Sequence, residues 1–457
     1  MSARSANRAS QPQRVLVANR GEVALRIIRA AHALGWETVA IHSDADADSH
    51  WVAQADASVH VGPSPARKSY LDIAAVIDAA KNSQCGYVHP GYGFLAESPE
   101  FAERVAAAGL VFVGPSATVI ESMGNKVRAR QSAEHARVPV VPGTGSLDEP
   151  EAVQQAAAEL AFPLMVKAAA GGGGKGIRVV TASEELSAAI SAAQAEAQAA
   201  FGDGAVYLEQ VISPARHIEV QILADTRGNV VHLFERDCSI QRRRQKLIEE
   251  APATGLSDAL RAQMTAAAVR LAADVGYQGA GTVEFLVQED RFYFLEMNTR
   301  IQVEHPITEM VTGVDLVAEQ LRIAAGAELS MSQDNIKLAG AAMEFRINAE
   351  DPEQDFFPSP GPITRFDLPE GAGIRVDSGF VAGGEIAPYY DSMLAKIIVH
   401  GRDRAQALAR ARQALSELAI EGIKTTQQLH LDLLRHPDVQ AGHVATEWLE
   451  QYLRGSS

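Results

Sequence analysis

Residues 292–306 read FYFLEMNTRIQVEHP, with polar side chains at every second position from Glu296 onward. Side chains alternate between the two faces of an extended chain, so one face is predicted to carry Glu296, Asn298, Arg300, Gln302 and Glu304. Carboxylate and amide oxygens can hold a hard cation, an arginine can hold a small planar anion, and a carboxylate can take a proton from that anion. The alternative is an edge strand with solvated, paired charges. The regular polar spacing against an apolar backing favours a reactive site.

The residues before this stretch predict a partner strand. Two apolar strands, 281–287 and 291–296, are expected to form a hairpin, with Glu284 interrupting the first. A three-residue loop, Glu289–Arg291, sets Glu284 opposite Glu296. Like charges placed opposite each other are destabilising unless a cation bridges them, so this geometry predicts a metal. A two-residue turn would instead put the two carboxylates on opposite faces.

The N-terminal part of the chain alternates strands with helices, which is typical of an open parallel sheet. We expect strands at 15–18, 38–42, 87–88 and 111–113, and helices at 22–34, 70–80 and 99–108. The first turn lacks the G-x-G-x-x-G fingerprint, which indicates a Rossmann-like domain without an obvious dinucleotide site. The loop HPGYGFL (89–95) follows the third of these strands and is either a ligand site or a tight structural turn.

A glycine-rich loop at 168–176 lies between predicted strands at 162–167 and 177–180. Its spacing formally matches the dinucleotide pattern, but a strand follows it, and Gly176 after Lys175 breaks the Walker pattern. We expect a mobile hairpin whose N–H groups close over phosphates, with a flexible linker as the alternative. The strand at 205–212, with Glu209 among apolar residues, could hold an adenine.

Two further patterns carry charge. The dense basic run QRRRQK (241–246) is either a solvated patch or, beside a phosphate loop, an anion site. The segment 342–348 alternates and sets Glu344, Arg346 and Asn348 on one face. Short strands are expected through 358–399, followed by a helix at 404–418.

Composition limits the classes of protein. The 457 residues allow two to four domains, and 47% apolar with 21% charged residues is ordinary for a soluble protein. The balance of 41 basic against 57 acidic residues, net −16, argues against a nucleic-acid partner. No apolar run approaches the roughly 20 residues that cross a bilayer, so no membrane partner is expected. Two cysteines, Cys85 and Cys238, fit a reducing compartment, and a cytoplasmic location is expected. Residues 1–13 are expected to be a disordered tail.

Eight motifs in order resemble the biotin carboxylases, which are ATP-grasp subunits or domains of acyl-CoA carboxylases such as acetyl-CoA carboxylase. They are ANRGE (18–22), HPGYGFL (89–95), GNK (124–126), the glycine loop, RDCS with QRR and QK (236–246), EMNTRIQVEHP (296–306), EFRINAED (344–351) and PYYDSM (388–393). The resemblance implies an α/β fold (α+β overall). It also implies a Rossmann-like N-terminal domain at 14–125, an ATP-grasp domain at 126–334 with a mobile lid at about 140–212, and a β-rich C-terminal domain with terminal helices at 335–457.

The resemblance also implies the site residues. The ATP-binding set is Lys126, Lys167, Gly173, Gly174, Glu209, Gln210, Val211, Ile212, His217, Arg244, Glu284 and Glu296, of which Glu209–Ile212 hold the adenine edge and His217 the ribose. Two Mg²⁺ or Mn²⁺ ions are assigned to Glu284, Glu296 and Asn298. Bicarbonate is assigned to Lys246, Arg300, Gln302 and Val303, with Glu304 as its base. Biotin is bordered by Tyr92 and Gly93, and Arg346 faces its ureido oxygen. The implied catalytic residues are therefore Arg300, Glu304, Lys246 and Arg346.

The implied activity is ATP-dependent carboxylation of biotin by bicarbonate through carboxyphosphate, the first half-reaction of an acyl-CoA carboxylase. The expected partners are a biotin carboxyl carrier, carboxyltransferase subunits and a second copy of the chain. No Met-Lys-Met biotinylation signature occurs, so biotin is expected on a carrier or on a portion outside this chain. Ala170, Lys175, Gln210 and Arg244 depart from the commoner family pattern. The rival interpretations are another ATP-grasp ligase, such as a carbamoyl-phosphate or peptide-forming enzyme, and a catalytically idle nucleotide-binding subunit.

Overall fold

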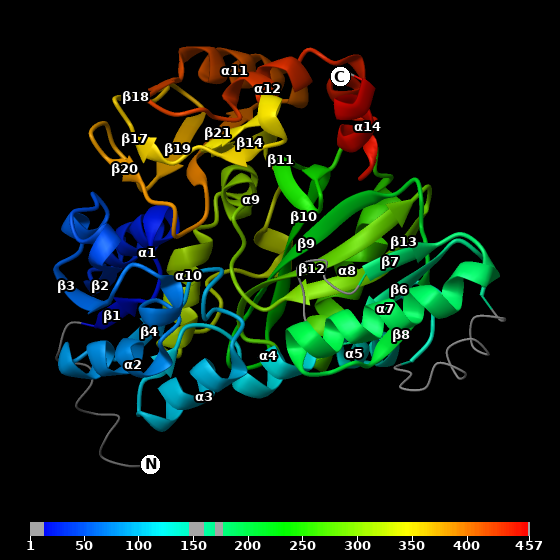
Figure 1. Ribbon diagram of the computed structural model, residues 1–457. Coiled ribbons are helices and arrows are strands. Elements are labelled where there is room, and N and C mark those ends of the chain that lie inside the picture. Colours follow the sequence, from blue (N-terminus) through cyan, green and yellow to red (C-terminus); the bar gives the residue numbers. More distant parts are fainter. Residues whose placement is uncertain (1–12, 146–159, 170–176, 456–457) are drawn as a thin grey trace.

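The computed structural model describes residues 13–145, 160–169 and 177–455, and its N-terminal part is a parallel sheet flanked by helices (Figure 1). The strand order is β3-β2-β1-β4-β5, with every pair parallel. This confirms the Rossmann-like prediction. The elements are β1 (Arg14–Val17), α1 (Gly21–Ala33), β2 (Glu37–Ser43), β3 (Ala57–Gly62), α2 (Ile73–Asn82), β4 (Tyr87–His89), α3 (Pro99–Ala107) and β5 (Val111–Phe112). Strand β3 (ASVHVG) was not predicted, although Ala57, Val59 and Val61 alternate with Ser58, His60 and Gly62; only Val61 is buried.

An eight-stranded sheet forms the centre of the molecule, in the order β13-β12-β9-β10-β11-β14-β21-β19. Its strands are β9 (Arg216–Ala224), β10 (Val230–Arg242), β11 (Gln245–Ala251), β12 (Gly279–Gln288), β13 (Arg291–Asn298), β14 (Ala341–Asn348), β19 (Ile374–Ser378) and β21 (Met393–Gly401). All its pairs are antiparallel. Helix α8 (Asp258–Asp274) packs on β9 and β10 through buried residues such as Met264 and Leu271. Strands from the middle and the C-terminal part of the chain therefore share one sheet.

A small antiparallel sheet, β7-β6-β8, lies beside this large sheet (Figure 1). It consists of β6 (Leu164–Ala168), β7 (Ile177–Val180) and β8 (Val206–Gln210), and α7 (Ser183–Phe201) covers it. Leu164, Leu186, Ile190 and Leu208 belong to its own hydrophobic core. The expected glycine hairpin over 170–176 and most of the expected tail at 1–13 lie outside the described residues.

The remaining helices join these layers. Helix α10 (Leu316–Ala324) packs on α1 through Val317 and Leu321, and α9 (His305–Thr312) packs on β14 and β10. Helix α11 (Arg404–Glu417) covers β21 and β14. Shorter helices are α4 (Ala117–Gly124), α5 (Lys126–His135), α12 (Gln427–Leu433), α13 (Pro437–Ala441) and α14 (Trp448–Gly455). In the part of the chain that the structure describes, no helix combines the length and apolar character needed to cross a membrane.

The structure corrects one local prediction and decides between two alternatives for a turn. The extended chain expected over 292–306 ends at Asn298, and Glu304 instead precedes the first turn of α9. Ile301 is fully buried against Leu316 and Ile323, so burial turns the chain off the sheet, which alternation alone does not reveal. The β12–β13 turn also has two residues rather than three, because Gln288 pairs with Arg291.

Candidate active site

One lysine ammonium lies among three buried carboxylates at the middle of the large sheet. Lys246 Nζ, at the start of β11, is 2.6 Å from Glu219 Oε2, 2.9 Å from Glu284 Oε1 and 2.5 Å from Glu304 Oε1. The three acids come from β9, from β12 and from the residue before α9. Burial lowers the pKa of Lys246, but the surrounding acids raise it further, so the ammonium stays charged.

Glu304 is held between two cations. Its Oε1 accepts from Lys246 and its Oε2 accepts from an Arg346 N–H at 2.9 Å, while the carboxylate is 1% exposed. Burial raises the pKa of Glu304, but Lys246, Arg346 and Arg236 lower it more, to well below its usual range. The carboxylate is therefore ionised in the structure.

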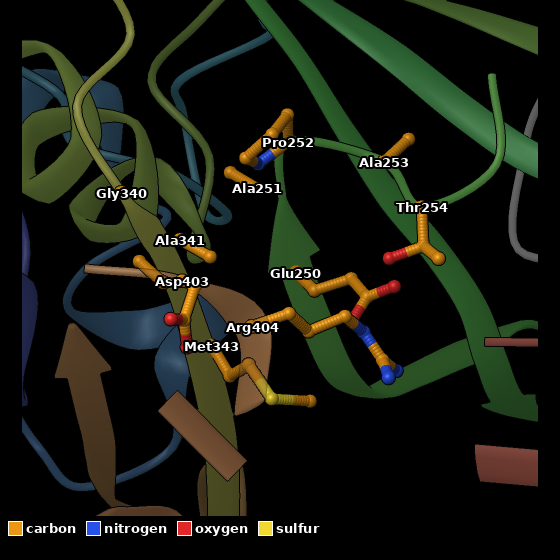
Figure 2. A pocket seen from close by; sticks show the side chains of 11 residues that line it. Glu250, Ala251, Pro252, Ala253, Thr254, Gly340, Ala341, Met343, Asp403 and Arg404 are labelled. Atoms are coloured by element: carbon orange, nitrogen blue, oxygen red, sulfur yellow. The ribbon is translucent and has the colours of Figure 1, made fainter. Parts of the chain in front are cut away.

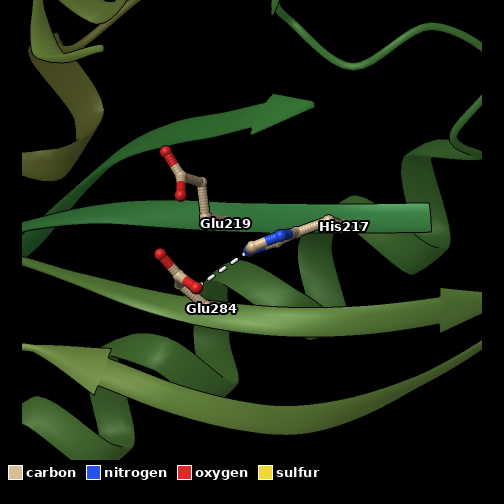
Figure 3. A group of neighbouring side chains, drawn as sticks. All are labelled: His217, Glu219 and Glu284. Atoms are coloured by element: carbon tan, nitrogen blue, oxygen red, sulfur yellow. Dashed lines mark hydrogen bonds and ion pairs between the residues drawn. The ribbon is translucent and has the colours of Figure 1, made fainter. Parts of the chain in front are cut away.

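Glu284 lies opposite Glu296 on the neighbouring strand, as the metal prediction requires. The Asn298 amide donates to Glu284 at 2.9 Å, and Glu284 lies 2.9 Å from His217 Nε2. Figure 3 shows the His217 ring directed at Glu284, with Glu219 on the same strand as His217. Burial and Glu284 both raise the pKa of Glu296. Opposed carboxylates with an adjoining amide are a donor set that fits a divalent cation.

The loop that follows β13 is fixed from three sides. Arg300 donates to Glu97 at 2.9 Å and to the Asn298 side chain at 2.9 Å. The Gln302 amide accepts from Arg236 at 2.7 Å through its oxygen and donates to Glu284 at 2.7 Å. Because a guanidinium only donates, Arg236 fixes which way this amide points. The Val303 carbonyl accepts from Lys396 at 2.8 Å.

The HPGYGFL loop lies beside this cluster and is also pinned structurally. The Asn19 amide donates to the carbonyls of Pro90 and Tyr92, both at 2.7 Å. The Tyr92 phenol donates to Glu22, and Glu22 in turn pairs with Lys396 at 3.1 Å. Gly93 is exposed, with φ +68°. The loop is therefore a tight turn held beside the cluster, and its role as a ligand site stays a prediction.

The residues predicted for the nucleotide are divided between the two sheets. His217, Glu284 and Glu296 lie on the large sheet, whereas Lys167 and Glu209–Ile212 lie on or directly after the small one. Lys167 on β6 pairs with Glu209 on β8, and Arg130 is 3.5 Å from the same carboxylate. The pKa of Lys126 is lowered, mainly by burial. The Glu296 charge raises this pKa and the Lys167 charge lowers it, so the three groups are close enough to affect one another. Gln210 ends β8, and Val211 and Ile212 follow it half-buried.

Arg244 is exposed at the tip of the β10–β11 turn, with φ +67°. Gly173 and Gly174, together with Ala170 and Lys175, lie outside the described residues.

Sequence reasoning assigned no role to several residues that the structure brings into the cluster: Glu97, Glu219, Arg236, Glu249 and Lys396. Most of them lie on β9, β10, β11 and β21, which are buried strands whose polar positions are far apart in sequence. The sequence did contain one indication of these residues, namely charged side chains within otherwise apolar strands. Charged residues inside apolar strands are rarely buried without a partner.

A cavity of about 200 Å³ lies elsewhere, between the large sheet and the segment that opens α11, and it contains none of the predicted site residues (Figure 2). Its lining includes Glu250, Met343 and Arg404. Arg404 already donates to Glu250 at 2.8 Å and to the Val439 carbonyl at 2.7 Å. We assign this cavity no ligand.

Three family models match the chain. They are "Biotin carboxylase, N-terminal domain" at residues 11–120, "Carbamoyl-phosphate synthase L chain, ATP binding domain" at 125–332 and "Biotin carboxylase C-terminal domain" at 344–451. The chain is 51% identical to biotin carboxylase 1 of Bacillus subtilis (strain 168) over 443 residues, which is 96% of this chain and 98% of that protein.

Solved structures agree with the sequence comparison. The biotin carboxylase–β-γ-ATP complex from Campylobacter jejuni superimposes with a TM-score of 0.94 at 44% identity, covering 97% of this chain and 100% of that one. The biotin carboxylase domain dimer of Hydrogenobacter thermophilus 2-oxoglutarate carboxylase, in complex with MgADP, ADP and bicarbonate, gives 0.92 at 46% identity, covering 96% and 97%.

Proposed function

The chain belongs to the biotin carboxylase family, whose reaction is the ATP-dependent carboxylation of biotin by bicarbonate, and we propose that the charged cluster around Lys246 carries this reaction. The observation that carries the proposal is the position of Glu304. It is a buried, ionised carboxylate between two cations, 2.5 Å from Lys246 and 2.9 Å from Arg346. A bound anion would engage the same two cations, and this would raise the pKa of Glu304 toward that of a general base.

Bicarbonate is a poor nucleophile and must be held and activated. Lys246 and Arg300 bind the anion by charge, and Gln302 and the Val303 backbone complete its contacts. Glu304 then takes the bicarbonate proton, so that a bicarbonate oxygen attacks the γ-phosphorus of ATP. The products are carboxyphosphate and ADP. Excluding water protects carboxyphosphate, which otherwise decomposes quickly.

The nucleotide lies between the small sheet and the large one. Lys126 and Lys167 contact its phosphates, and Glu209 to Ile212 hold the adenine. His217 contacts the ribose and Arg244 adds a charged contact. The resemblance assigns Gly173 and Gly174 to the phosphates, but both lie outside the described residues. Glu284, Glu296 and Asn298 would hold two Mg²⁺ or Mn²⁺ ions. When bound, these ions offset charge on the transferring phosphoryl group.

Biotin enters beside Tyr92 and Gly93. Carboxyphosphate releases CO2, and the departing phosphate takes the proton from the ureido nitrogen, which then bonds to the carbon of CO2. Arg346 stabilises the negative charge that appears on the ureido oxygen. Preorganised charges of this kind typically contribute about 10²–10³ in turnover.

The partners follow from this chemistry. Biotin arrives on a carrier protein or domain, and a carboxyltransferase passes the carboxyl group to an acyl-CoA or another acceptor. We propose a homodimer, a cytoplasmic location consistent with two buried free thiols, and domain limits of 14–125, 126–334 and 335–457. Analytical ultracentrifugation tests the dimer.

The test of function is one turnover assay with ATP, Mg²⁺, bicarbonate and free biotin. We expect carboxybiotin formation and ADP release that both require bicarbonate. Release that depends instead on ammonia or on an amine acceptor would indicate another ATP-grasp ligase, and no release at all would indicate an idle subunit. Glu304→Gln, which keeps the shape of the side chain, is expected to remove bicarbonate-dependent release by about 10²-fold or more.

A further inference from the structure

Six side chains, four of them buried and the other two (Lys246 and Arg346) largely so, form a continuous chain of alternating charge through the site. In order they are Arg236, Glu219, Lys246, Glu304, Arg346 and Glu249, and successive closest contacts up to Arg346 measure 2.5, 2.6, 2.5 and 2.9 Å. The last link joins Arg346 Nε to Glu249 Oε1 at 2.6 Å. The proposed reactive groups Lys246, Glu304 and Arg346 lie in the middle. The residues at both ends have fully buried side chains.

Glu249 has one strong partner. Its Oε1 accepts from Arg346, and its Oε2 has no hydrogen-bond partner among the described residues. Glu344 lies directly opposite it in the β11–β14 register and is also fully buried. Burial, together with the nearby Glu304 charge, raises the pKa of Glu249 to about 7, although the Arg346 guanidinium lowers it. Burying a carboxylate costs solvation free energy. The ion pair with Arg346 is the interaction that offsets this cost for Glu249.

Arg346 is therefore held from two sides, by Glu304 and by Glu249. These two contacts change differently during the proposed reaction. When Glu304 takes the bicarbonate proton it becomes neutral, and its attraction for the guanidinium falls. Glu249 contacts the same guanidinium nitrogen as Glu304 but takes no part in that proton transfer, so it keeps its partner.

We propose that Glu249 is a positioning residue, which keeps the Arg346 guanidinium in place for the biotin step after Glu304 has been protonated. This inference rests on the roles proposed above for Arg346 and Glu304. It predicts that loss of the Glu249 charge affects the second step of the reaction and spares the first.

The neighbouring residue supplies a matched control. Glu250 follows Glu249 on β11, so its side chain points to the opposite face of the sheet. It makes the same kind of pair there, with Arg404 Nε at 2.8 Å from its Oε2, in the cavity of Figure 2. Glu250→Gln therefore removes an equivalent charge, one residue away and remote from the reactive groups.

The experiment compares Glu249→Gln, Glu250→Gln and Arg346→Ala in two assays. One measures bicarbonate-dependent ADP formation without biotin, and the other measures carboxylation of free biotin. Glu249→Gln is expected to lower the kcat for biotin carboxylation by about 10- to 100-fold and to leave ADP formation within about twofold of wild type. Glu250→Gln is expected to change neither rate. Arg346→Ala is expected to preserve ATP binding and to lower carboxylation by at least about 10²-fold.

The outcomes separate the two proposals. If Arg346→Ala leaves carboxylation intact, the proposed function of Arg346 fails. The positioning role of Glu249 is overturned if Arg346→Ala lowers carboxylation but Glu249→Gln does not. It is also overturned if Glu249→Gln lowers ADP formation and carboxylation equally. If Glu249→Gln does not fold, Glu249→Asp takes its place in both assays. This variant keeps the carboxylate but moves it away from Arg346 by one methylene group. A loss confined to carboxylation supports the role, whereas an equal loss in both assays, or none, contradicts it.

Discussion

Glu284 on β12 lies directly opposite Glu296 on β13, although the turn that joins these strands would by itself set them on opposite faces. Gln288 pairs with Arg291 across a two-residue turn, and this register holds as far as Phe285 and Phe294. The next pair is Glu284 with Glu296, which leaves Leu295 as an extra residue in β13. A bulge of one residue reverses the facing of all later side chains, so Leu295 is what brings the two carboxylates together.

This pairing predicts opposite effects of Glu296→Gln with and without metal. In EDTA the variant is expected to unfold at a higher temperature than wild type, because it removes a repulsion between facing carboxylates. With ATP present, its affinity for Mn²⁺ is expected to fall by about tenfold or more, because one oxygen ligand of negative charge is lost. Thermal unfolding and Mn²⁺ titration followed by EPR measure the two effects. Glu289→Gln, in the exposed turn of the same hairpin, makes the same charge change and is the control.

His430 on α12 predicts an acid dependence of stability. Its Nε2–H donates to the Arg346 carbonyl at 2.7 Å, Nδ1 has no partner among the described residues, and burial lowers its pKa to about 4. Between pH 6.5 and 4 the unfolded chain binds a proton that the folded chain does not. The folded state therefore loses stability as the pH falls through this range, by roughly 3 kcal/mol in total.

His430→Gln keeps a donor near the position of Nε2 and removes the titrating group. The free energy of unfolding of this variant, from urea titrations at pH 7, 6 and 5, is expected to vary less with pH than that of wild type. His135, whose side chain is 78% exposed, provides the control His135→Gln. An unchanged pH slope in His430→Gln would show that His430 does not contribute to this dependence.

Much of the site was open to sequence reasoning because its residues are local in sequence. Glu296, Asn298, Arg300 and Gln302 lie within seven positions, so periodicity alone grouped them, and the structure places three of them in contact with one another or with Glu284. The pattern does not show where a strand stops. Asn298 ends β13 because Ile301 is drawn into the core, which is a tertiary effect.

The rest of the site could not be read from local pattern. Arg236 and Glu249 lie on long buried strands, and only the order of β9, β10, β11 and β14 brings them to Gln302 and Arg346. The bulge at Leu295 has no residue signature, because leucine is ordinary in strands. The β10–β11 turn could not be predicted either. Its central residues Arg243 and Arg244 both have positive φ, whereas turns of this kind favour Asn-Gly.

Lys246 predicts a separation between stability and activity. Lys246→Met leaves Glu219, Glu284 and Glu304 without their shared cation, and breaking a buried ion pair in this way is expected to cost about 3–5 kcal/mol. Adding Glu219→Gln removes one of the three charges and is expected to restore part of that loss. Bicarbonate-dependent ADP formation is expected to stay at least about 10²-fold below wild type in both variants. Lys337→Met, at an exposed position, is the control.

Lys396 predicts strong coupling with Glu22. This fully buried ammonium donates to the Val303 carbonyl at 2.8 Å and lies 3.1 Å from Glu22. Lys396→Met leaves Glu22 without its cation and is expected to cost about 3–5 kcal/mol of unfolding free energy. Adding Glu22→Gln is expected to recover at least about half of it, since Asp377, which lies 3.8 Å from Lys396, keeps its own partner Arg375 at 2.7 Å. The KM for bicarbonate is nevertheless expected to remain raised in the double variant, because the Val303 carbonyl has lost its donor and the loop that holds the anion is less fixed. Urea unfolding of wild type, the two single variants and the double variant measures the coupling, and bicarbonate titrations of ADP release measure the KM. If the two changes in unfolding free energy simply add, the coupling is contradicted.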